Sequence, residues 1–107
     1  MMMDLIRLPA RSVRDLLKDR QVSPLELLDA LEHRISEVDG AVNALPTLCF
    51  ERARQRAREG DFSGLPLAGI PVAIKDLLPV SGVRTTFGSM AYRDHIPEVS
   101  DLLVERI

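Results

Sequence analysis

Apolar residues recur at helical spacing from the start of the chain. Val13, Leu16 and Leu17 fall on one side of a first helix. Ser12 can cap this helix, because Asp15 lies three positions further on, where a capping-box carboxylate belongs. The pattern therefore predicts a helix that begins at Ser12 and buries one side.

A second helix carries stronger signals at its start. Ser23 is the expected N-cap, Pro24 occupies the first helical position, and Glu26 completes a capping box. Gly40 is the expected end. One face of this helix is apolar, formed by Leu28, Leu31, Ile35 and Val38. Since the link between the two helices is short, residues 1–40 are predicted to form an antiparallel helical hairpin.

A third helix is predicted over residues 50–58. Phe50, Ala53 and Ala57 stand at helical spacing there, and Gly60 stops the pattern. This helix and the loop that follows it belong to residues 41–107, which we expect to form the start of an α/β core.

A short continuous apolar run ends on a lysine. Residues 70–74, Ile-Pro-Val-Ala-Ile, are typical of a strand covered on both faces, and Lys75 follows directly. An amine held at the end of such a strand is desolvated, which lowers the pKa of lysine toward neutrality and makes it a usable base. A second extended piece is predicted over residues 85–89, where β-branched and small residues gather.

Composition narrows the possible partners. The 107 residues are 46% hydrophobic and 28% charged, as is ordinary for a globular domain, and a net charge of −2 offers no general field for nucleic acid or anionic lipid. Cys49 is the single cysteine, which excludes a disulfide framework and a cysteine metal site; we expect it to be a small buried residue. No apolar run reaches the roughly 20 residues that span a bilayer. Without a signal-peptide pattern, the cytoplasm is the expected compartment.

The block from Leu67 to Ser89, LAGIPVAIKDLLPVSGVRTTFGS, resembles the early conserved block of the amidase signature family. Ser23–Leu27 and Val42–Ala44 match the usual amino-terminal positions of that family, so the resemblance covers almost the whole chain. It implies an α/β fold in which helices sandwich a large mixed sheet. These residues would contribute a helical hairpin and a few strands, an α+β piece of a single amidase domain.

The resemblance also implies a reaction. Members cleave carboxamides with a lysine, a bridging serine in a cis peptide and a nucleophilic serine, and Lys75 stands where the family keeps its catalytic lysine. No cofactor or metal is implied, and the substrate would be a small-molecule amide. The two serines lie in a Gly/Ser-rich tract that does not occur in these 107 residues. The chain alone is therefore expected to be inactive.

The end of the sequence supports the same interpretation. A helix is predicted to begin near Ser100, with Leu102, Leu103 and Ile107 on its apolar face, and no Gly or Asn caps it before the sequence stops. We expect an amino-terminal piece of a longer protein. Strand edges and an uncovered leucine-rich face would favour a homo-oligomer.

Other polar residues have simpler explanations. Asp76 could orient Lys75 but is more simply a structural residue, and Ser81 and Ser89 are expected to shape the backbone, since neither sits in a nucleophile elbow. His33 and His95 lack partners at metal-ligand spacing. Arginines alternate through residues 52–58 and would fan around a helix, so they predict no nucleic-acid site.

Two alternatives remain open at this stage. The chain could belong to a glutamine-hydrolysing subunit of a tRNA-dependent amidotransferase, a branch of the same family. It could instead be a truncated relative that acts as a non-catalytic interaction module through its helical hairpin.

Overall fold

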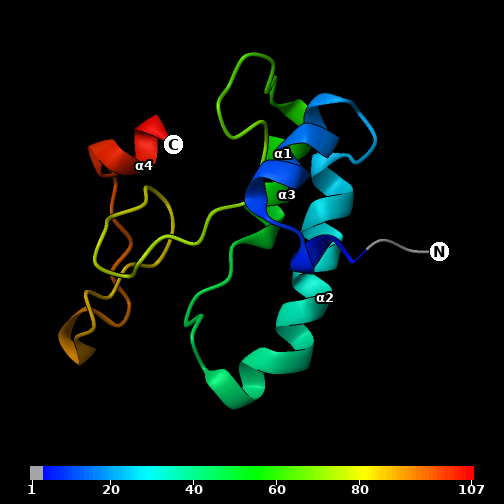
Figure 1. The fold of residues 1–107 in the computed structure, drawn as a ribbon. Coiled ribbons are helices and arrows are strands. Elements are labelled where there is room, and N and C mark those ends of the chain that lie inside the picture. The colour runs from blue at the N-terminus through cyan, green and yellow to red at the C-terminus, as the bar shows by residue number, and fades with distance from the viewer. Residues whose placement is uncertain (1–3) are drawn as a thin grey trace. The chain divides into compact units, whose positions relative to one another are not determined.

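The computed structural model describes residues 4–107, which divide into two compact units (Figure 1). The first unit ends at Pro71 and the second comprises Val72–Ile107. The first unit contains a short 3-10 helix and three α-helices: η1 (Leu5–Arg7), α1 (Ala10–Lys18), α2 (Pro24–Val42) and α3 (Phe50–Glu59). The second contains η2 (Met90–Tyr92) and α4 (Leu102–Arg106). The first unit thus extends beyond residue 40, because α3 and the loop after it belong to it.

The N-cap of helix α1 (Ala10–Lys18) lies three residues earlier than predicted. Pro9, not Ser12, is the N-cap residue, and its carbonyl accepts the first helical hydrogen bond from the Val13 amide at 3.1 Å. Proline has its φ fixed near the helical value and has no N–H to satisfy, so a helix can start after it without a side-chain cap. On the predicted inner side, Val13 and Leu17 are buried and Leu16 is half-buried.

The start of helix α2 is as predicted, but its end is not. The Ser23 hydroxyl accepts a hydrogen bond from the Glu26 amide at 3.1 Å, and Pro24 opens the helix. The helix passes through Gly40 and stops at Asn43, which adopts a left-handed conformation with φ of 53°. The Asp39 carboxylate accepts a hydrogen bond from the Ala44 amide at 2.8 Å. Asparagine tolerates this conformation and Asp39 satisfies the next donor, so the cap forms beyond Gly40.

The N-cap of α2 gives a first testable prediction. Ser23→Ala is expected to lower the free energy of unfolding by about 1 kcal/mol, because the Glu26 amide loses its acceptor. Thermal unfolding followed by circular dichroism measures the change. Ser36→Ala is the matched control, since Ser36 is exposed within the same helix and caps nothing. Equal stability of the two variants would contradict the role given to Ser23.

The core of the first unit is small and lies between helices and a loop. Val13 and Leu17 of α1 pack with Leu27 of α2 and with Ala68, and all four are buried. Helix α2 packs most extensively against α3 and also touches η1. The predicted third helix is confirmed, with Gly60 as its C-cap. Cys49, predicted to be buried, is exposed at the start of α3, because the apolar side of that helix begins only at Phe50.

The second unit is held by turns rather than by a sheet. The predicted strands at residues 70–74 and 85–89 are wrong for the described residues, where the only β pairing is an isolated bridge between Val80 and Val83. A strand requires a neighbour to take up its amides and carbonyls, and no segment within 4–107 provides one. The helices predicted for this part of an α/β fold are present, and residues 4–107 form no sheet.

Single backbone hydrogen bonds connect distant residues of the second unit. The Asp101 amide donates to the Pro79 carbonyl at 2.9 Å, the Gly82 amide to the Pro97 carbonyl at 3.0 Å, and the Thr85 amide to the His95 carbonyl at 3.0 Å. Thr85 is 2% exposed, and its hydroxyl donates to the Val83 carbonyl. These bonds fix the loop around Thr85 without any ladder.

Large apolar side chains are exposed in the second unit. Helix α4 is capped by Asp101, one residue after the predicted start, and its apolar side is uncovered. The exposed residues include Met90, Ile96, Val99, Leu102, Leu103 and Ile107. Such a surface favours association, and the homo-oligomer stays a prediction. Among the helices of residues 4–107, none is long and apolar enough to cross a membrane.

Candidate functional site

Lys75 lies in the second unit at the start of a turn. Its carbonyl accepts a hydrogen bond from the Leu78 amide at 2.9 Å, which closes the turn over residues 75–78. The side chain is exposed, so the desolvation predicted for the amine is absent from the described residues. The reason is the missing sheet: residues 70–74 have no strand neighbours that would enclose the end of the run.

Asp76 is bound to Thr86, ten residues further along the chain. The Thr86 amide donates to Asp76 Oδ1 at 2.8 Å, and the Thr86 hydroxyl donates to Asp76 Oδ2. The hydrogen bond from the Thr86 hydroxyl makes the largest contribution to lowering the pKa of Asp76, and the bond from the Thr86 amide makes the next largest. The positive charge of Arg84 lowers this pKa further. The structural role predicted for Asp76 is supported, although its partner is Thr86 and not the turn that follows.

The lowered pKa of Asp76 predicts how the second unit responds to acid. A carboxylate whose pKa is depressed on folding stabilises the fold at pH values above the ordinary aspartate pKa of about 3.9. That contribution is lost as the pH falls through the lower, folded pKa. We expect the Thr86 amide resonance in NMR spectra to shift over this acidic range. The same resonance in Asp76→Asn should show no such transition, and an identical titration in that variant would contradict the assignment.

Two serines considered as nucleophiles have backbone roles, as predicted. The Ser81 hydroxyl donates to the Glu98 carbonyl at 2.8 Å, and the Ser89 hydroxyl accepts from the Ala91 amide at 3.2 Å at the start of η2. His95 lies in a cluster of rings, 5.8 Å from Phe87 and 5.6 Å from Tyr92 between ring centroids. Within residues 4–107 no group of three metal-ligating side chains comes together.

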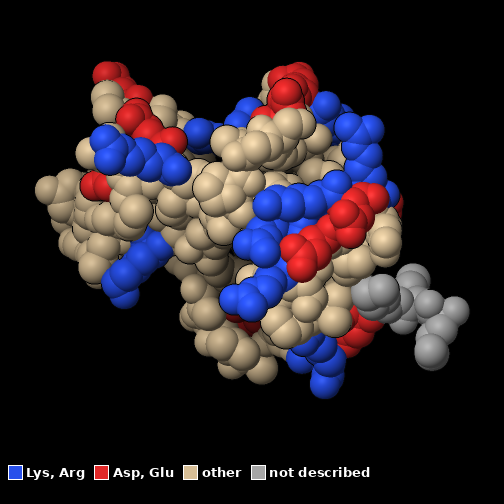
Figure 2. All heavy atoms as spheres, turned by 45° about the horizontal axis from the view of Figure 1, so that its top comes forward, with Lys and Arg blue, Asp and Glu red and all other residues tan. Residues whose placement is uncertain are grey.

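One arginine of α3 is held by acidic side chains of α2. Arg54 binds Asp29 and Glu32 of α2 and lies 5.6 Å above the Phe50 ring centroid. The hydrogen bond with Glu32, followed by that with Asp29, raises the pKa of the Arg54 guanidinium. Figure 2 shows acidic and basic side chains next to one another on the face it presents, so their fields offset each other at this surface.

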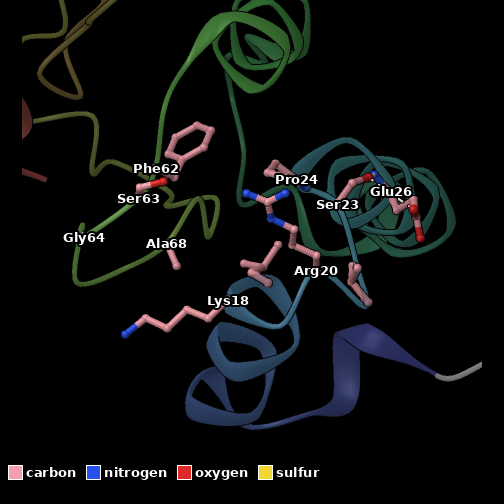
Figure 3. Close-up of a pocket in the computed structure, with 11 residues that line it drawn as sticks. Lys18, Arg20, Ser23, Pro24, Glu26, Phe62, Ser63, Gly64 and Ala68 are labelled. Atoms are coloured by element: carbon pink, nitrogen blue, oxygen red, sulfur yellow. Dashed lines mark hydrogen bonds between the residues drawn. The ribbon is translucent and has the colours of Figure 1, made fainter.

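One hollow of about 520 Å³ lies within the first unit (Figure 3). Lys18 at the end of α1 and Arg20 in the connection to α2 line one part of it, and Phe62, Ser63, Gly64 and Ala68 line another. Glu26 also lines it, so both charges are present. Ser23 also lines the hollow, and its hydroxyl donates to a Glu26 carboxylate oxygen at 3.3 Å, but this pair is the capping box of α2. The hollow belongs to the packing of the α2 start against the loop after α3.

Thr86 is the residue of this site that the sequence did not reveal. The β-branched pair at 85–86 predicted a strand, whereas Thr86 is 9% exposed and holds the Asp76 carboxylate. A spacing of ten residues through a loop has no periodic signature, so no pattern in the sequence links the two side chains.

The chain is similar in sequence to a known family and to several known proteins. The profile of the Amidase family matches residues 26–107. A glutamyl-tRNA(Gln) amidotransferase subunit from Desulforamulus reducens is 37% identical over 112 residues, covering 98% of this chain and 23% of that protein. The subunit of the same name from Thermoanaerobacter pseudethanolicus is 37% identical over 110 residues, and that from Moorella thermoacetica 38% over 111 residues, with 98% of this chain covered in both cases.

Each alignment covers nearly all of this chain but only a small part of the relative. The chain spans 22% of the Thermoanaerobacter protein and 23% of the Moorella protein, less than a quarter of either. No solved structure matches the chain.

Proposed function

Because this chain belongs to the amidase family, we propose that it is the amino-terminal part of a hydrolase that cleaves the C–N bond of carboxamides, with Lys75 as its base. The observation that carries the proposal is the family match, which spans residues 26–107 and so includes Lys75, Asp76 and Thr86. The chemical character of the residues agrees with it, since Lys75 follows directly on an apolar run.

The proposed mechanism is acyl transfer to water. The Lys75 amine, in its neutral form, takes a proton through a bridging serine from the serine that attacks the amide carbonyl. Backbone N–H groups hold the oxyanion, and the relay returns the proton to the leaving amine. Water then releases the acyl group by the same route. The 107 residues supply the lysine only, and both serines would come from the part of the domain that the matched relatives have beyond this segment.

Lys75 is exposed in these residues, so the proposal requires that the rest of the protein cover it. A base lysine must be shielded from water, because hydration favours the charged ammonium form. The 107 residues span only 22% of the Thermoanaerobacter relative. We place the shielding surface in the additional length of such a protein, where it would cover the exposed lysine and the apolar residues of the second unit together.

A chimera tests the proposal. In it, residues 1–107 replace the matching amino-terminal segment of the Thermoanaerobacter pseudethanolicus protein, which is 37% identical. We expect the purified chimera to release ammonia from glutamine or a simple aliphatic amide, and the free 107-residue chain to release none. A chimera with the circular dichroism spectrum of the parent and no ammonia release would overturn the proposal, and would favour a non-catalytic interaction module.

A second candidate is a glutamine-hydrolysing component of a tRNA-dependent amidotransferase. The names of the matched relatives favour it, because all three are subunits of a glutamyl-tRNA(Gln) amidotransferase. The same chimera separates the two candidates when the remaining subunits and glutamyl-tRNA(Gln) are added. Ammonia release that depends on these partners indicates the amidotransferase, whereas release that is independent of them indicates a free amidase.

A further inference from the structure

Thr86 is the centre of a small hydrogen-bonded group. It donates to both carboxylate oxygens of Asp76, through its amide and its hydroxyl, and its hydroxyl also accepts from the Gly88 amide at 3.3 Å. The side chain is nearly buried, at 9% exposed. Because Thr85, its neighbour, is fixed by hydrogen bonds through both its amide and its hydroxyl, Thr86 is a firm anchor point.

The group restrains the backbone that carries Lys75. Asp76 follows Lys75 directly, so a carboxylate fixed at Thr86 limits the rotation of the peptide between them. The Leu78 amide bound to the Lys75 carbonyl at 2.9 Å supplies a second restraint on the same residue. Residues 70–74 form no ladder in the described chain, so these two restraints define where the lysine side chain starts.

The Asp76 carboxylate is bound to Thr86 and forms no ion pair with the Lys75 amine in residues 4–107. A carboxylate in contact with a lysine favours the ammonium form, which cannot accept a proton. Both oxygens of Asp76 are taken up by Thr86, and Lys75 takes part in no ion pair among residues 4–107. Asp76, which would favour the charged form of Lys75 if the two were in contact, instead holds the turn through Thr86.

We infer that Asp76 and Thr86 are positioning residues for Lys75: the hydrogen bonds between them fix the lysine-bearing turn and withhold the Asp76 carboxylate from the amine. This inference rests on the proposed function of Lys75 as the base. Neither residue touches the reacting atoms, and both act through the placement of the lysine.

The first experiment tests the turn itself in the 107-residue chain. We compare Thr86→Val, which removes the hydroxyl at nearly constant volume, with Thr86→Ser, which keeps it. Valine is expected to shift the NMR resonances of residues 75–78 and to speed hydrogen exchange of the Leu78 amide, and serine is expected to leave both close to the parent. Ser89→Ala is the control, since its hydroxyl caps η2 outside this group. Unchanged resonances in Thr86→Val would overturn the inference.

The second experiment measures catalysis in the chimera. Thr86→Val is expected to lower kcat for ammonia release by about 10- to 100-fold, as for a misplaced catalytic group, with KM unchanged. Thr86→Ser should restore kcat, and Asp76→Asn gives an independent reduction if valine impairs folding. A loss of kcat that serine does not restore would overturn the positioning role. If Lys75→Ala is itself fully active, the proposed function fails, while the NMR comparison still decides whether the turn is held by Thr86.

Discussion

Lys75→Ala in the chimera is expected to lower kcat for amide hydrolysis by about 10²- to 10⁴-fold, the usual contribution of a positioned general base. The Lys75 side chain is exposed in the described chain and makes no ion pair there, so its removal takes little packing from the fold. The effect should therefore fall on turnover and not on stability. Steady-state ammonia release measures the first, and circular dichroism with thermal unfolding measures the second.

Lys18→Ala is the matched control for this experiment. Lys18 is the other lysine of the 107 residues, it is also exposed, and it lies at the end of α1 in the first unit. The substitution removes the same charge and the same methylene groups, and kcat should stay at the level of the parent chimera. Similar turnover in the Lys75 and Lys18 variants would defeat the assignment of Lys75 as the base.

Leu27→Ala is expected to destabilise the first unit by about 2–5 kcal/mol, the range for truncating a buried leucine. Leu27 is 5% exposed and contacts the side chains of a core with few members, Val13, Leu17 and Ala68. In so small a core few neighbouring side chains can move into the cavity that the substitution leaves. Because domains have only about 5–15 kcal/mol of stability in total, this loss should leave the unit partly unfolded. Urea unfolding followed by the helical circular dichroism signal provides the measurement.

Leu48→Ala controls for the loss of a leucine side chain as such. Leu48 is 54% exposed in the segment between α2 and α3. Its truncation should change the free energy of unfolding by no more than about 0.5 kcal/mol. A comparable loss in both variants would mean that the cluster around Leu27 is not the main source of stability in the first unit.

Features with a local cause could be predicted from the sequence. The cap of α2 depends on Ser23, Pro24 and Glu26, which are close together along the chain, and its geometry is as expected. The end of α3 at Gly60 also depends on close neighbours. The predicted end of α2 at Gly40 is wrong although it also rests on a local signal, because Asn43 and Asp39 together cap the helix better than Gly40 does.

Features that depend on distant residues could not be predicted in the same way. A buried strand at 70–74 requires strands on either side, and the apolar run alone cannot indicate whether they are present. The expected burial of Lys75 depended on that strand and failed with it. The bond between Asp76 and Thr86 joins residues that neither periodicity nor capping relates. The candidate base was identified by resemblance, while the residues that hold it became visible only in three dimensions.

The three long-range backbone bonds of the second unit lie one inside another: 79 with 101, then 82 with 97, then 85 with 95. A loop closed in this nested way opens from its outer bond inward, since each inner closure is shorter and loses less entropy when formed. Detachment of the chain around Asp101 would leave the innermost closure intact. Thr86, which binds Asp76, follows Thr85 of the innermost bond directly. The backbone of Lys75 would therefore stay in place during fluctuations that release helix α4.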